Sequence, residues 1–159
     1  MAQETDHVYH RKIDSLWNYC MSTSDNVPGK KFTKKIIRNQ KTYVAKWEYR
    51  AFVFEGDSLL MLTIGFDVKP NRSQDECYLV RNNELVYAGV FHTVYGAYPN
   101  GLKREPAPVA ASSLYFKGHY AGRAYPSYGD FPAIWNSADA VKEQFQQVYA
   151  LLKTEMKKK

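Results

Sequence analysis

Residues 42–95 read TYVAKWEYRAFVFEGDSLLMLTIGFDVKPNRSQDECYLVRNNELVYAGVFHTVY, and this stretch decides the fold. Its four apolar segments (42–54, 58–68, 77–81 and 84–95) are rich in Val, Tyr, Phe and Leu, which favour strands. Short polar links with Gly, Pro, Asn or Asp separate these segments, so consecutive strands must fold back on one another. The stretch therefore predicts an antiparallel β-meander.

Side-chain alternation predicts how each strand of the meander is covered. Trp47 falls on one face of segment 42–54, whereas Lys46, Glu48 and Arg50 fall on the other face, where water or a ligand contacts them. Segment 58–68 has apolar residues on both faces, which predicts a central strand covered from both sides. The Asn82-Asn83 link suits a two-residue turn, because Asn tolerates positive φ.

Amphipathic helices are predicted at both ends, from about residue 5 to 21 and after a cap at Ser137. Residues 112–120 predict a fifth strand, whereas the prolines of 96–111 argue against a central strand there. Residues 30–40 fit either a short helix or a basic edge strand. We thus expect one α+β domain over 1–159, an antiparallel β-meander of about five strands packed with an N-terminal and a C-terminal amphipathic helix. Its expected single core contains Leu16, Trp17, Trp47, Leu60, Leu62, Ile64, Phe145 and Val148.

The composition favours a cytoplasmic protein of one domain. The chain has 159 residues and two isolated cysteines, Cys20 and Cys77, a number typical of buried thiols in a reducing compartment. No run of eighteen apolar residues is present, and the first residues lack the pattern of a signal peptide. We therefore expect no membrane segment, and the sequence leaves the oligomeric state open.

Positive charge is concentrated in two places. The net charge is +6, and six basic residues lie between Lys30 and Lys41, while residues 153–159 form a basic tail that we expect to fray. Such asymmetry indicates an anionic partner, and nucleic acid would then bind through Lys34, Lys35 and Arg38. The alternative is that the lysines only keep a tyrosine-rich domain soluble.

Histidines offer the only enzymatic hypothesis. His92 and His119 lie near the ends of predicted strands, and paired imidazoles perform acid–base steps in phosphodiester chemistry. Neither occurs in a repeated His-x-Thr or His-x-Ser pattern, so two structural histidines are the favoured interpretation. His7 and His10 have the spacing to share a metal, but no ligand set surrounds them, and we expect neither a metal nor a cofactor.

The other candidate surface combines aromatic and basic residues in the loops after residue 95. Rings stack on bases and cations hold phosphates in nucleotide recognition, and Tyr, Trp and Arg also dominate protein–protein hot spots. Packing of the loops onto the sheet is the structural alternative. The candidates for binding a partner or ligand are Tyr98, Lys103, Arg104, Lys117, His119, Arg123, Tyr125 and Tyr128.

Three segments also carry a family resemblance. KKIIRNQKTYVA (34–45), FEGDSLLMLTIGF (54–66) and DECYLVRNNELVYAGVFHTVYG (75–96) resemble an uncharacterised bacterial domain that occurs alone or appended to helix-turn-helix regulators. The resemblance covers residues 34–96, and this chain has no helix-turn-helix portion. It implies the meander and no activity.

Three classes of function follow. We favour a non-catalytic binding protein of the inhibitor, immunity or anti-defence type, as in phage or bacteria, that engages a protein or an anionic nucleotide-like ligand. The alternatives are a small nucleotide- or phosphodiester-processing enzyme using His92 and His119, and a regulatory protein that docks nucleic acid through Lys30–Lys41.

Overall fold

The computed structural model describes residues 6–38, 40–69, 72–97, 103–117, 120–123 and 137–158, with side chains in 7–38, 40–67, 73–93, 113–117 and 137–158. The elements in chain order are α1 (Asp6–Thr23), η1 (Ser24–Asn26), β1 (Lys30–Arg38), β2 (Lys41–Phe54), β3 (Asp57–Lys69), β4 (Arg72–Arg81), β5 (Glu84–Ala97), β6 (Lys103–Lys117), β7 (Tyr120–Arg123) and α2 (Ala138–Met156).

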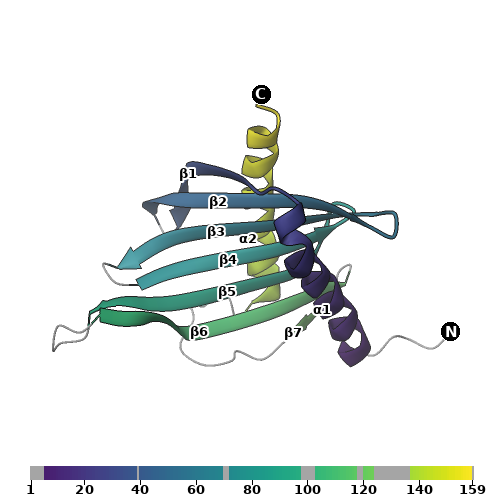
Figure 1. Ribbon diagram of the computed structural model, residues 1–159, viewed down its shortest axis with the longest axis horizontal. Coiled ribbons are helices and arrows are strands. Elements are labelled where there is room, and N and C mark those ends of the chain that lie inside the picture. The colour runs from purple at the N-terminus through teal and green to yellow at the C-terminus, as the bar shows by residue number, and fades with distance from the viewer. Residues whose placement is uncertain are drawn as a thin grey trace.

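The strands form one antiparallel sheet in sequence order, β1 to β7, which confirms the α+β class and the meander (Figure 1). The sheet has seven strands where about five were expected. One added strand is β1, so the basic segment is an edge strand and not a helix. The other is β7, which pairs with only the last four residues of β6.

Two tight turns set the register of the central hairpins. Asn82 and Asn83 have φ of 50° and 67° between the paired residues Arg81 and Glu84, as the sequence predicted for this turn. Positive φ at both central positions matches the right-handed twist of the flanking strands. Across the sheet, Arg81 donates from Nε to Asp57 Oδ2 at 2.8 Å, which ties the β4–β5 turn to the β2–β3 turn.

Residues 103–111 belong to strand β6, which corrects the expectation of a loop there, whereas the expectation that the prolines exclude a central strand holds for the described strands. β6 pairs with β5 on both sides of Pro106, and Pro108 lies opposite Thr93. The register shifts between His92 and Thr93, and β7 reaches only residues 114–117 of β6. Along its proline-bearing part, β6 therefore has one described neighbour, and a missing N–H is tolerated at such an edge.

The helices pack on opposite faces of the sheet and build two cores instead of one. Figure 1 shows α1 crossing one face near one end of the strands and α2 crossing the other face. Consecutive residues of a strand point to opposite faces, so Leu62 packs with α2 while Met61 packs with α1. Leu16 belongs to the α1 core and Trp17 packs against it, so the expected single core is wrong, although Leu62 is fully buried as predicted.

Side-chain contacts hold each helix in place. On the α2 face, Ser137 Oγ caps the helix by accepting from Ala140 N, as the sequence predicted, and the predicted core residues Phe145 and Val148 are buried. On the α1 face, Tyr115 donates its hydroxyl to Asp14 Oδ1 at 2.7 Å, and the His10 ring stacks on Tyr115 with centroids 4.0 Å apart. The buried residues of the α2 stripe are Val141, Gln144, Phe145, Val148 and Leu152.

Candidate functional site

A charged groove lies on the α1 face, beyond the part of the sheet that α1 covers. The helix packs near the β2–β3 and β4–β5 turns, against residues such as Phe52, Leu59 and Leu79. Toward the opposite ends of the strands, no described element covers the α1 face, and a groove of about 490 Å³ opens there. It is lined by Lys31, Phe32, Thr33, Lys46, Trp47, Glu48, Thr63, Gly65 and Asp75.

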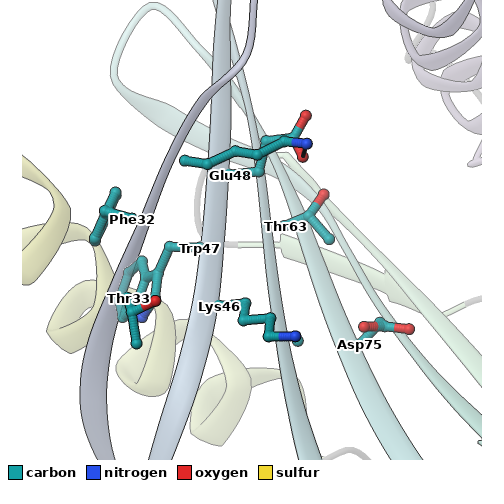
Figure 2. A pocket seen from close by; sticks show the side chains of 9 residues that line it. Phe32, Thr33, Lys46, Trp47, Glu48, Thr63 and Asp75 are labelled. Carbon is teal, nitrogen blue, oxygen red and sulfur yellow. Dashed lines mark ion pairs between the residues drawn. The ribbon is translucent and has the colours of Figure 1, made fainter.

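Strand register explains why these residues meet. Thr33, Lys46, Gly65 and Asp75 form one row across β1, β2, β3 and β4, because each is the cross-strand partner of the next. Figure 2 shows Lys46 and Asp75 on the same side of the sheet, away from Trp47, which belongs to the core under α2. The groove thus joins residues that are far apart in the sequence on one rigid surface.

The β1 side of the groove is cationic. Lys31 and Lys35 flank Thr33 on the same face of β1, and Lys46 lies directly opposite Thr33 on β2. Diagonal neighbours in a sheet are about 7–8 Å apart, so Lys31 and Lys35 are both close neighbours of Lys46 on this face. Glu48 is the carboxylate on this side, and two cations already contact it: Lys31 at 3.8 Å and Arg50 at 2.5 Å.

The β4 side of the groove holds Asp75 over a glycine. A Cβ built on Gly65 would lie 2.7 Å from Asp75 Oδ1, so the carboxylate occupies the space that any other residue at 65 would fill. Loss of hydration, and secondly the charge of Asp67, raise the pKa of Asp75. Protonated, this carboxyl donates a hydrogen bond; ionised, it accepts one, so Asp75 can orient a polar ligand in either form.

Cys77, the partner of Thr63 on β4, lies at the boundary between the groove and the α1 core. Burial raises the pKa of this thiol to about 12, and its Sγ lies 3.6 Å from Gly89 O. Burial likewise raises the pKa of Cys20 to about 11. Because the thiolate is the nucleophilic form, neither cysteine is activated at neutral pH.

A second polar site lies beneath α2 and is closed to solvent. Glu76 is only 1% exposed. Its carboxylate accepts four hydrogen bonds, from Arg38 Nη2 (2.9 Å), Gln74 Nε2 (2.9 Å), Tyr78 OH (3.0 Å) and Gln144 Nε2 (3.3 Å). Burial raises the pKa of Tyr78 well above its usual range, so its hydroxyl keeps the proton that it donates. A buried carboxylate with this many donors ties β1, β4 and α2 together.

The residues predicted to bind nucleic acid do not share a surface. Lys34 and Arg38 lie on the α2 face of β1, and Lys35 lies on the α1 face. Arg38 binds Glu76, and Lys34 is 3.8 Å from Glu155 on α2. Of the three, Lys35 alone lies on the face of the sheet that carries the groove, although it does not line the groove itself.

The predicted aromatic and basic loop surface is only partly described. Lys103 and Arg104 begin β6 and Lys117 ends it, so these residues lie at opposite ends of a strand roughly 45 Å long. Lys117 is exposed, and its ammonium lies 5.2 Å from the ring centroid of Tyr9. Arg123 ends β7. Tyr98, His119, Tyr125 and Tyr128 lie outside the described residues.

The proposed histidine pair is likewise half described. His92 is half-buried on β5, between Gln74 of β4 and Ala110 of β6, and His119 lies outside the described residues. Within the described residues, no group of three His, Cys, Asp or Glu side chains could hold a metal, and no helix is long and apolar enough to cross a membrane.

No family model, curated protein or solved structure matches this chain. The resemblance of residues 34–96 to a bacterial domain therefore stays a prediction. Sequence reasoning missed Thr33, Thr63, Gly65 and Asp75, because their convergence depends on the register of four strands. The alternation of Lys46, Glu48 and Arg50 was the one local sign of the groove, and it correctly indicated an open polar face.

Proposed function

We propose that the protein is a non-catalytic binding protein that holds a small phosphate-bearing anion, such as a nucleotide, in the groove of the α1 face. The observation that carries the proposal is that Lys31, Thr33 and Lys46 line the groove together, while Lys35 lies on the same face of β1. Ammonium groups and a hydroxyl are ordinary partners of phosphate oxygens. Thr63 and Asp75 extend the same surface by a hydroxyl and a carboxyl that suit the polar part of a nucleotide.

The groove supplies binding groups in preference to reacting groups. Its described polar side chains are lysines, threonines and two carboxyls, and one of these carboxyls is already engaged by two cations. The neighbouring Cys77 keeps its proton at neutral pH because burial raises its pKa. These features favour sequestration of a ligand over its conversion, as in inhibitors and immunity proteins.

Titration calorimetry with inorganic pyrophosphate and with mono-, di- and cyclic nucleotides tests the proposal. We expect binding at low salt that weakens as salt rises, since the contacts are charge–charge interactions at a surface. Lys46→Met should weaken binding about fivefold to tenfold, as expected for one hydrogen bond between charged groups that water partly screens. Lys30→Met is the matched control, because Lys30 is an exposed lysine on the opposite face of β1.

Two results would contradict the proposal. Equal losses in the Lys46 and Lys30 variants would show a diffuse charge effect and no site in the groove. Product formed from any of the nucleotides and detected by chromatography would show that the protein is an enzyme. Turnover that disappears in His92→Ala would then support the histidine mechanism.

A further inference from the structure

The outer edge of β1 is the second feature that the fold leaves without a described partner. β1 pairs with β2 through all nine residues from Lys30 to Arg38, and β1 is the first strand of the sheet. Its other side therefore presents a row of backbone N–H and C=O groups to which no described strand binds. Such a row is a template for one more strand.

The side chains along this edge are strongly basic. Lys30, Lys31, Lys34 and Lys35 are present, and β1 contains no acidic residue. Lys30, Lys31 and Lys35 are exposed, and Lys34 is partly buried. Two of the four lysines lie on each face of the strand, Lys30 and Lys34 on the α2 face and Lys31 and Lys35 on the α1 face. An added strand would therefore meet positive charge on both of its faces.

Two exposed apolar residues lie near the end of β1, next to the β1–β2 turn. Ile37 is 70% exposed and Val44 is 62% exposed. Ile37 pairs with Thr42, and Val44 pairs with Lys35, so the two apolar side chains are diagonal neighbours on the α1 face. An added strand could cover Ile37 with one apolar side chain near its end.

We propose that the outer edge of β1 binds an acidic, extended segment of a partner protein as an eighth strand of the sheet. Main-chain hydrogen bonds would supply affinity, and alternating side chains would supply specificity, as in other cases of strand addition. The segment would carry acidic residues against the four lysines and one apolar residue against Ile37. This inference shares Lys31 and Lys35 with the proposed anion site, but it differs from that site because it also requires the backbone of β1.

A second copy of the chain is disfavoured as the occupant. Pairing two β1 edges would bring lysines of one copy next to lysines of the other, and like charges in cross-strand positions are destabilising. Lysines on an edge thus oppose self-association while they favour an acidic strand. The charge pattern therefore selects a partner of opposite charge.

Fluorescence anisotropy with labelled nine-residue peptides tests this inference on the full chain. The parent peptide alternates Glu with Thr and has one terminal Val, and two derivatives are N-methylated on odd or on even positions. We expect the parent and one derivative to bind, and the other derivative to lose at least tenfold in affinity. The reason is that only every second N–H of an added strand points at β1. Equal binding of both derivatives would overturn the inference, because side-chain charge alone would then explain the affinity.

Two further measurements complete the test. Lys35→Glu should weaken binding of the acidic peptide and strengthen binding of a peptide with Lys in place of Glu. Lys46→Met should preserve the difference between the two N-methylated derivatives, although it weakens nucleotide binding. Sedimentation without peptide should show no dimer that uses this edge. A dimer that the acidic peptide cannot dissociate, or no binding of the parent peptide at low salt, would overturn the inference.

Discussion

Asp75 and Glu76 are consecutive residues of β4, yet the two faces of the sheet treat their carboxyls in opposite ways. Glu76 points under α2, where it is 1% exposed and accepts hydrogen bonds from four side chains. Asp75 points to the α1 face, where it is half-buried in an open groove and its pKa is raised. No described residue donates a hydrogen bond to Asp75.

The difference separates a structural charge from an available one. Four donors already satisfy the Glu76 carboxylate, so a ligand has little to add there, and α2 closes the access. Asp75 has lost part of its hydration without gaining a donor, so a polar ligand in the groove can supply one. We therefore assign stability to the α2 face and binding to the groove of the α1 face.

The largest expected effect comes from removing the cation that compensates Glu76. Arg38→Met leaves a buried carboxylate without its ion-pair partner, and such a change typically costs about 3–5 kcal/mol. Urea denaturation should therefore show a loss of this size. Lys34→Met is the matched control on the same face of β1. Its 3.8 Å contact with Glu155 is partly exposed to water, so the expected loss is below about 1 kcal/mol.

The double variant Arg38→Met/Glu76→Leu decides whether the effect belongs to the pair. Replacing both charged partners removes the uncompensated charge, so the double variant should be more stable than Arg38→Met alone. A double variant less stable than both single variants would show that the network stabilises the fold through contacts other than this ion pair. A variant that neutralises Lys34, Lys35 and Arg38 together would therefore lose stability through Arg38, and it would not be a clean test of nucleic-acid binding.

A core substitution on the α2 face should give the next largest effect. Leu62 is fully buried in the core beneath α2, and Leu62→Ala should cost about 2–5 kcal/mol through lost transfer energy and a residual cavity. Val53→Ala, at a position that is 73% exposed, should change the free energy of unfolding by less than about 0.5 kcal/mol. Similar losses in the two variants, measured by urea denaturation, would show that the register of the sheet differs from the one described.

The sheet was predictable because local chemistry determines it. The Asn82-Asn83 turn, the alternation in β2 and the doubly apolar β3 each follow from short stretches of sequence, and the structure confirms them. The errors concern long-range arrangement. The single core was predicted wrongly because β3 is apolar on both faces. Its sequence therefore fits two helices on the same face of the sheet as well as two helices on opposite faces.

The groove was less predictable than the sheet. A helix would have placed Lys34, Lys35 and Arg38 close to one side, whereas the strand β1 sends Lys35 to one face and the other two to the opposite face. The approach of Asp75 to Gly65 depends on the pairing of β3 with β4, which no local pattern reveals. Whether residues 30–38 form a helix or a strand thus decides which lysines lie on the face of the candidate site.

The smallest expected effect tests the Asp75 side of the comparison directly. The raised pKa means that folding favours the protonated carboxyl, so the native state binds more protons than the unfolded state above the ordinary value of 3.8. Stability is therefore lost as pH rises through the native pKa. The Asp75→Asn side chain cannot ionise, so this variant should be more stable than the parent at pH 7, by less than about 1 kcal/mol, and the difference should vanish below pH 3.8.

Asp57 should show the opposite pH dependence, because hydrogen bonds from Asn82 and Arg81 lower its pKa. Asp57→Asn should therefore destabilise the protein at pH 7 and lose that effect in acid. Urea midpoints between pH 3 and 8 measure both differences. If Asp75→Asn also destabilised the protein at pH 7, the Asp75 carboxylate would have a favourable partner in the fold and would not be available to a ligand.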